Sequence, residues 1–388
     1  MARLRLPHLT RPLLAVLLLL TGLAHGVGEV AQSSAASATI NEGVRFDPNR
    51  LDEQPLWSAG VTSPPASTNI SEQARPGVWD FAEIGDRIFV AGQFPTVKPA
   101  WNAGEVNQSY LAAFDRDTGE WISSFRPSLN DGAFALDVTQ TGKLLVGGRF
   151  TRVNGSNRTG LVALDPQTGA IDPTFGASVA RWYSNDKAIV RGFERDGSDL
   201  YVVGDFDHIN YGNDSYRVWS AARLRANSGQ LDPSWLPKVR YGAWDVAVDR
   251  GRGRVHLSGD FDSINGSSSQ RKFGTVSRAS GDLVGGVNRL QLNNATQNQR
   301  PAVTMAADRL FVSGSQHVTS VLRASDNSQI GFYSWGTTSD SYSYGGSFGG
   351  GDVQVSETVD GWVLTGCHCW NRSGNASRLH YSSFNGRR

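Results

Sequence analysis

Oxygen ligands of the kind that bind calcium occur in a seven-residue phrase that is present twice, GDFDHIN at 204–210 and GDFDSIN at 259–265. Alternating carboxylate and amide oxygens are the ligands that Ca²⁺ prefers. The D-x-D-x-[DN]-G loop with a terminal Glu is absent, so solvated turn acids are the alternative interpretation. The candidate ligands near the first copy are Asp205, Asp207, Asn210, Asn213 and Asp214.

Charged side chains also recur at the start of a short stretch that we interpret as the first strand of each of six units. Around the mouth of a channel such residues could hold a cation or a polar ligand. The alternative is that each Asp accepts backbone N–H bonds from a neighbouring turn. The aligned residues are Asp80, Asp137, Arg191, Asp245, Val303 and Asp352.

Aromatic residues gather in the loops predicted to share one face with that column. Exposed flat rings beside Asn, Asp and Ser suit stacking on sugars or gripping a protein partner. The alternative is that many of them fill the wedge between neighbouring sheets. The candidate ligand-binding residues are Trp101, Trp182, Tyr183, Tyr211, Tyr216, Trp219 and Trp370, and the same loops also carry His208.

The two cysteines lie one residue apart, Cys367 and Cys369, in GCHCWNRSG. In a strand they point to the same side, with His368 opposite. A local disulfide or a pair of buried thiols is the interpretation that we favour. A C-x-C pair alone is far from a zinc site, which needs four ligands or three and a water.

The sequence contains no nucleophile elbow, phosphate loop or H-E-x-x-H motif. Net charge is +1, from 37 Lys and Arg against 36 Asp and Glu, without a basic block, so a nucleic-acid partner is not indicated. We therefore assign no catalytic residue, and the sequence leans away from an enzyme.

The elements that position these residues are read from an internal repeat. Glycines fall in one column at Gly92, Gly148, Gly204, Gly259, Gly314 and Gly366, with spacings of 56, 56, 55, 55 and 52. Each unit shows four short strand patterns separated by turn residues, as in ALDVTQ (135–140), KLLVGGRF (143–150) and GLVALD (160–165). Four antiparallel strands per repeat predict an all-β, six-bladed β-propeller.

The two ends of the folded region predict that the ring closes. The last unit stops after its third strand pattern at 377–384, and residues 44–61 resemble an orphan fourth strand. Together they would complete one blade and protect an open sheet edge. A stack of repeats that does not close is the alternative.

The N-terminus has the layout of a secretory signal peptide. Arg3, Arg5 and Arg11 precede an apolar run that is too short for a transmembrane helix, and small residues follow near Ala24. We predict a signal peptide at 1–26, a linker at 27–43 and a single propeller at 44–388, secreted and monomeric, with no membrane span once the signal is removed. An uncleaved anchor is the alternative.

The stretches AGQFPTV…YLAAFDRDTGEWISSF and GGRFTRVNGSNRTGLVALDPQTGAIDPTF (147–175) resemble the delta-60 repeats of secreted bacterial propellers. The resemblance implies the propeller fold and supplies no catalytic residues. The stretch LAAFDRDTGEW (111–121) also resembles the A-x-D-x-x-T-G-x-x-W phrase of pyrroloquinoline quinone propellers, although one residue and not two separates Gly119 from Trp121, and later units lose the Trp.

Together these patterns predict a secreted or cell-surface propeller that binds an extracellular glycan or protein through one loop face. A quinoprotein-like oxidoreductase and a purely structural matrix component are the alternatives. Calcium is the one cofactor that the residues themselves suggest.

Overall fold

The structure is a computed structural model of the 388-residue chain. It describes residues 3–5, 59–61, 77–100, 102–290, 300–314, 318–334, 353–359, 362–370 and 376–383. These ranges contain strands, turns and bends but no helix, and so none that is long and apolar enough to cross a membrane. Of the predicted signal peptide and linker, only residues 3–5 are described, so both remain predictions.

Within the described ranges, six sheets repeat one antiparallel order of first, second and third strand. Sheets one and two contain β3 (Gly77–Ile84), β4 (Arg87–Gln93) and β7 (Leu111–Asp115), then β8 (Ala133–Val138), β9 (Leu144–Gly148) and β12 (Leu161–Leu164). Sheets three and four contain β14 (Ile189–Asp196), β15 (Asp199–Asp205) and β18 (Ala221–Arg225), then β20 (Ala243–Asp249), β21 (Arg254–Gly259) and β23 (Phe273–Ser277). Sheets five and six contain β24 (Ala302–Ala306), β25 (Arg309–Gly314), β26 (Val318–Arg323) and β27 (Gln329–Ser334), then β28 (Val353–Val359), β29 (Trp362–Trp370) and β30 (Ala376–Ser383).

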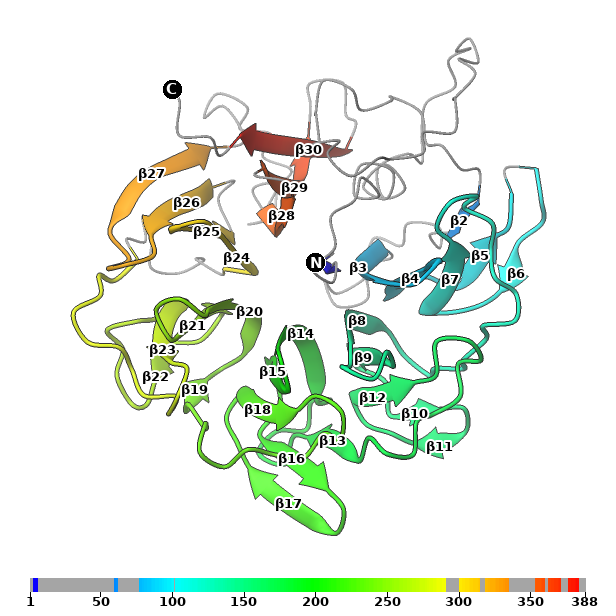
Figure 1. Ribbon diagram of the computed structural model, residues 1–388, viewed down its shortest axis with the longest axis horizontal. Helices are drawn as coiled ribbons and strands as arrows, with labels where there is room; N and C mark the ends of the chain where they lie inside the picture. Colours follow the sequence, from blue (N-terminus) through cyan, green and yellow to red (C-terminus); the bar gives the residue numbers. More distant parts are fainter. Residues whose placement is uncertain are drawn as a thin grey trace.

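The sheets are arranged radially, with the first strand of each nearest a common centre (Figure 1). First strands of successive sheets contact one another from β3 through β8, β14, β20 and β24 to β28. This is the arrangement of a β-propeller. The first three strand patterns of each unit are confirmed in type and order.

The predicted fourth strand is shorter than expected in sheets one to four. It is reduced to an isolated bridge, as between Leu164 and Ile171 or between Leu224 and Leu231. In sheets two and three Pro173 and Pro233 follow two residues after these bridges and have no N–H to donate to a longer ladder. Sheets one and four also form only a bridge, Phe114 with Trp121 and Val276 with Leu283, without a proline at this place. Sheet five has no proline in this stretch and forms the full strand β27.

The segment between the second and third strands forms a small hairpin in each of the first four sheets. Each hairpin pairs with the segment that precedes the first strand of the same sheet. The hairpin strands are β5 (Thr96–Lys98) and β6 (Val106–Asn107), β10 (Arg152–Val153) and β11 (Ser156–Asn157), β16 (His208–Tyr211) and β17 (Asp214–Arg217), and β22 (Ser263–Ile264). Their partners are β2 (Gly60–Val61), Leu129, β13 (Ala177–Ala180) and β19 (Val239–Arg240).

Two of these hairpins turn at an Asn-Gly pair, as the sequence predicts. Asn154 and Asn265 have φ of 49° and 51°, and the glycines after them also have positive φ. Both residues of a type I′ turn need that conformation. The Asn154 side chain accepts a hydrogen bond from the Ser128 amide at 2.8 Å and donates to the Gly169 carbonyl at 2.9 Å. The asparagine therefore also ties the hairpin to the neighbouring segments.

The glycine column lies where the second strand crowds the first. A Cβ at Gly204 would lie 2.0 Å from the Ile189 carbonyl oxygen, and one at Gly92 would lie 2.1 Å from that of Gly77. A one-residue β-bulge in the first strand causes this crowding in both sheets. Any side chain larger than hydrogen is excluded here.

A second repeated position precedes the third strand and has positive φ. It is occupied by Tyr110, Gly160, Ser220 and Lys272, with φ between 57° and 70°. In each case the carbonyl of this residue accepts the N–H of the column glycine. Its own N–H donates to the carbonyl of the Phe that lies two residues after that glycine, as from Ser220 to Phe206 at 3.0 Å. Three non-glycine residues therefore hold a strained conformation that the surrounding hydrogen bonds fix.

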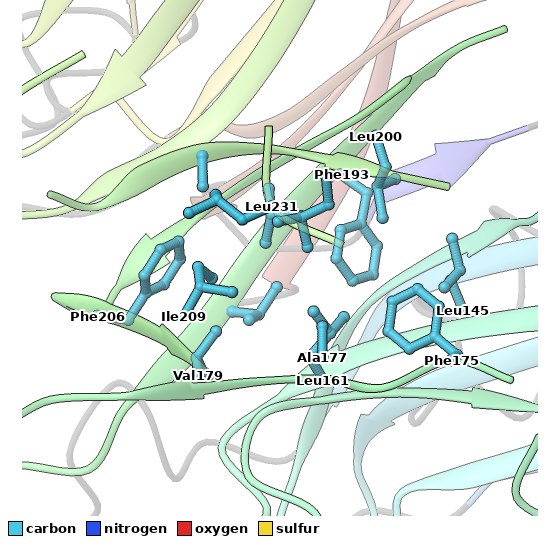
Figure 2. Packing of buried hydrophobic residues seen from close by; sticks show 14 of the residues in the cluster. Leu145, Leu161, Phe175, Ala177, Val179, Phe193, Leu200, Phe206, Ile209 and Leu231 are labelled. Carbon is cyan, nitrogen blue, oxygen red and sulfur yellow. The ribbon is translucent and has the colours of Figure 1, made fainter. Parts of the chain in front are cut away.

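The core lies between neighbouring sheets. Between sheets two and three, Phe206 and Ile209 pack with Val179, Phe193 and Leu161 (Figure 2). Phe261 and Ile264 occupy the same places between sheets three and four and are fully buried. This confirms that the Phe and Ile of the repeated phrase face cores between sheets.

The N-terminal strands do not take the places that the sequence predicts. Residues 60–61 pair with β5 at Val97 and Lys98, in the position that β13 and β19 occupy in later sheets, and not with the last sheet. β1 (Arg3–Arg5) pairs parallel with β3 and also contacts β28. Residues 44–58 lie outside the described residues, so closure of the ring by them remains a prediction.

Candidate functional site

The loop that joins β13 to β14 is held by one carboxylate. Asp207 accepts the backbone N–H of Trp182 at 2.8 Å and that of Tyr183 at 2.9 Å. Its Oδ1 also lies 2.7 Å from Nδ1 of the buried His208. Burial works to raise the pKa of Asp207, but the hydrogen bonds from His208 and the two amides outweigh it and hold that pKa below its usual value.

The rings of this loop project from the surface, although Asp207 fixes their backbone. Trp182 is 61% exposed and Tyr183 is 68% exposed. Trp182 stacks on the His208 ring with centroids 3.8 Å apart and planes at 24°, and Tyr183 lies 5.9 Å from the same ring. Each ring thus has a supported position and an exposed surface.

Arg217, at the end of β17, extends this arrangement. Its guanidinium carbon lies 4.7 Å from the ring centroid of Tyr183 and 4.7 Å from that of the half-buried Trp219. Both distances are those of a cation–π contact. We call Trp182, Tyr183, His208, Arg217 and Trp219 the aromatic platform.

The platform unites three of the seven aromatic residues predicted to bind a ligand, Trp182, Tyr183 and Trp219. Tyr211 is half-buried, and a Cβ at Gly176 would lie 3.2 Å from its ring, so it packs against that backbone. Tyr216 is 40% exposed and donates a hydrogen bond to Asp214 at 3.1 Å.

Two further aromatic predictions, Trp101 and the side chain of Trp370, lie outside the described residues. Sequence reasoning missed Arg217 and the exposed Tyr241 of sheet four. In the strand β17, with sequence DSYR, side chains alternate between the two faces, and this could have placed Arg217 on the same face as Ser215.

The oxygens proposed for calcium are occupied by other partners. Asp205 accepts from Arg191 Nε at 2.6 Å, Asp207 holds the loop amides, and Asn210 Oδ1 accepts from the Ser215 hydroxyl at 2.6 Å. No group of three or more His, Cys, Asp or Glu side chains suited to a metal occurs in the described part of the chain. These oxygens therefore have partners within the protein, and calcium binding by them stays a prediction.

In the second copy of the phrase the acids also face cations. Asp260 accepts from Lys272 Nζ at 2.5 Å, and Asp262 lies 3.6 Å from Arg240. The four aspartates that the first two units lack are therefore used for pairing within sheets three and four.

The charged residues that the sequence places in one first-strand column do not share one register position. Strand register aligns Asp80 with Ala135, Gly192, Asp245 and Ala302, because each pairs with the residue before the column glycine. Arg191 is the bulged residue of its strand and falls one residue before this column, and Asp137 falls two residues after it. Asp352 lies outside the described residues.

The two aligned acids join neighbouring sheets. Asp80 is fully buried; its Oδ1 accepts the Phe81 amide at 2.8 Å, and its Oδ2 accepts the Leu136 amide of the next sheet at 2.7 Å. Asp245 does the same with Val246 at 2.8 Å and with Val303 of the next sheet at 2.9 Å. This bonding supports the structural alternative for these carboxylates.

The bulged residues form a feature that the sequence alignment did not separate. Trp79 contacts Phe134 edge to face at 5.5 Å, and the Arg191 guanidinium lies 4.9 Å from the Trp244 ring centroid. Each pair joins the bulges of two successive sheets. Large side chains therefore line the inner rim on the face that carries the hairpins.

The phrase that resembles quinone propellers forms a turn. Asp115 Oδ1 accepts from the Asp117 amide at 3.0 Å, the Thr118 amide at 2.7 Å and the Thr118 hydroxyl at 2.9 Å. The second unit repeats this turn around Asp165, whose hydrogen bond from Lys143 holds its pKa at about 2. The Asp and Thr-Gly positions are thus explained by the turn. The side chains of Cys367 and Cys369 lie outside the described residues, so their state remains a prediction.

Comparison with known proteins supports the fold. Residues 139–175 match the profile of the family described as "Domain of unknown function (DUF5122) beta-propeller". None of the curated proteins matches the chain. The chain is similar in structure to BamB from Moraxella catarrhalis, at 12% identity, a TM-score of 0.42 and coverage of 79% of this chain and 73% of that one. It is similar to the computationally designed Ika8 protein at 9% identity, a TM-score of 0.42 and coverage of 80% and 98%. The matched family segment and the radial sheets identify the chain as an all-β protein with a β-propeller fold.

Proposed function

We propose that this propeller is a secreted or cell-surface protein that binds an extracellular glycan or protein through the aromatic platform of sheet three. The observation that carries the proposal is the fixed exposure of Trp182 and Tyr183. Large exposed rings are costly in water and are enriched where a partner covers them. Here Asp207 and His208 hold the two rings in place without burying them.

Rigidity of the platform favours binding over an incidental exposure. Rings that are already ordered lose little conformational entropy when a ligand stacks on them. The loops of a propeller also vary while the sheets stay constant, and binding differences are usually placed in such loops. These arguments favour ligand binding over a purely structural role.

The proposal includes the wider setting that the sequence predicts. We propose a ring of six delta-60-type blades closed by residues 44–58, export by the segment 1–26, and a monomer. The positively charged start and short apolar run support export. The platform needs no second subunit.

The proposal is tested by ligand screening of the full chain on glycan arrays and by pull-down from extracellular extracts, followed by titration calorimetry of each hit. The test variant is Trp182→Ala/Tyr183→Ala, and the matched control is Tyr241→Ala, which removes an equally exposed ring from sheet four. We expect the double variant to lose at least tenfold in affinity and the control to bind as the wild type does. Undiminished binding by the double variant would refute this site, and no saturable ligand at all would favour the structural alternative.

A further inference from the structure

Arg217 differs from the other arginines around it in having no acidic partner. Within the residues that the structure describes, no carboxylate lies within ion-pairing distance of its guanidinium, and its side chain is exposed. In the same sheet Arg191 pairs with Asp205, Arg223 with Asp232, and Arg225 with Asp199, at 2.6 to 2.9 Å. Among the described residues, therefore, no ion pair neutralises the charge of Arg217.

The rings on either side determine how Arg217 can be used. Tyr183 and Trp219 each lie 4.7 Å from the guanidinium carbon. A guanidinium has five N–H donors along its edge, in a planar fork that matches the two oxygens of a carboxylate. Because a cation–π contact does not use up these N–H donors, Arg217 can still donate to an incoming anion.

Two acids of the β13–β14 loop and of β17, Asp186 and Asp214, already have partners of their own. Asp186 accepts from the Ser184 hydroxyl at 2.7 Å and lies 3.5 Å from Arg181. Asp214 accepts from the Tyr216 hydroxyl at 3.1 Å. The platform thus joins an unneutralised cation to two exposed rings, Trp182 and Tyr183.

We infer that the platform binds an acidic glycan, with a sugar ring stacked on Trp182 or Tyr183 and its anionic group held by Arg217. This inference rests on the proposed function and names its ligand class. Only three large apolar side chains of sheet three are exposed, Trp182, Tyr183 and Tyr216. A protein partner needs about 800 Å² on each side, whereas one or two sugar rings match an area of this size.

Titration calorimetry of the full chain with oligogalacturonate tests the inference. The neutral comparison is the same oligosaccharide with its carboxylates methyl-esterified, which keeps the rings and removes the charge. A sulfated glycan, chondroitin sulfate, is the third arm and distinguishes a sulfate from a carboxylate ligand. Variants are Arg217→Gln and Arg217→Lys, with Arg240→Gln as the matched control because Arg240 lies in the same way over Tyr241 at 4.5 Å.

We expect esterification or Arg217→Gln to weaken binding at least tenfold, because a charge-assisted bidentate pair is lost. Arg217→Lys should retain part of the affinity, and Arg240→Gln should bind as the wild type does. All variants should melt at the wild-type temperature. Binding only to the sulfated arm, abolished by Arg217→Gln, would support the acidic class and exclude uronate.

Equal affinity for the charged and esterified sugars, or no effect of Arg217→Gln, would overturn the inference and leave the proposed function intact. If no glycan in any arm binds but a protein is captured through Trp182 and Tyr183, the inference also fails while the platform stands. If the full chain bound no glycan and no protein, both the inference and the proposed function would be refuted.

Discussion

Sheets three and four contain the same phrase, and the apolar half of it behaves identically in both. Phe206 and Phe261 are buried between sheets, and Ile209 and Ile264 are fully buried three residues later. Gly204 and Gly259 both crowd the first strand, with a virtual Cβ at 2.0 and 2.4 Å from a carbonyl oxygen. These positions are fixed by the close packing of the sheets.

The acidic half behaves differently in the two sheets. Asp207 holds two loop amides and a histidine, whereas the side chain of Asp262 is 43% exposed and faces Arg240 at 3.6 Å. The difference arises outside the phrase: eight residues, 181–188, separate β13 from β14, but only 241–242 separate β19 from β20. An aspartate at one position of a repeat therefore takes its role from the length of the loop opposite it.

The largest expected effect is on the shared apolar frame. Phe206→Ala and Phe261→Ala should each lower the free energy of unfolding by about 3 to 5 kcal/mol, because each leaves a cavity in a core between sheets. Urea unfolding followed by far-ultraviolet circular dichroism measures this. A loss in one sheet of less than half that in the other would show that the frames are not equivalent.

The next effect separates the two aspartates. Asp207→Ala should cost about 1 to 2 kcal/mol, because the amides of Trp182 and Tyr183 and the ring of His208 lose their acceptor. Asp262→Ala should cost less than about 0.5 kcal/mol, as exposed pairs do. Hydrogen exchange of the loop amides adds a local readout, and equal protection in both variants would contradict the role given to Asp207.

A smaller effect appears in the dependence of stability on pH. The folded-state pKa of Asp207 lies below its unfolded value of about 3.9. Its ionised form therefore contributes stability that is present above pH 4 and is lost as the pH falls through the folded-state pKa. As the pH falls from 5 to below the folded-state pKa, the urea midpoint of Asp207→Asn should decrease less than that of the wild type. Asp262→Asn serves as the control. If the stability of Asp207→Asn depended on pH as that of the wild type does, the explanation would be ruled out.

The smallest effect is expected from moving the histidine. Ser263→His places in sheet four the residue that differs between the two phrases, but no long loop lies opposite to stack on it. We expect a change within about 0.5 kcal/mol in unfolding free energy, as for an ordinary surface substitution. A clear gain in stability would show that the histidine alone, without the loop, accounts for the difference.

The repeating features could be predicted because each unit constrains them in the same way. The glycine column, the buried Phe and Ile, and the Asn-Gly turns all follow from residue types with one conformational or packing role. The charged column could not be aligned, because residue types do not show which residue of a strand is bulged. Arg191 is the bulged residue of its strand, and Asp137 lies two residues past the register position of Asp80. The length of the fourth strands was overestimated. The prolines at 173 and 233 oppose a longer strand in sheets two and three, but sheets one and four form only a bridge without a proline there.

The site was predicted only in part because it depends on contacts between distant segments. The loop at 181–188 is distinguishable as aromatic, but its backbone is held by a carboxylate 25 residues away. Arg217 belongs to the platform through its position across a hairpin from His208, which pairs with it in register. Such pairings follow from the hairpin length and not from composition.

The carboxylates of Asp80 and Asp245 bear on how the chain assembles as it is made. Each is buried, and each reaches forward to an amide of the following sheet, Leu136 or Val303. Until that later strand exists, the acid lacks this hydrogen bond, and burying it then costs more free energy than in the finished protein. At these two joints a sheet therefore receives this contribution only after synthesis has run 56 or 58 residues past the aspartate.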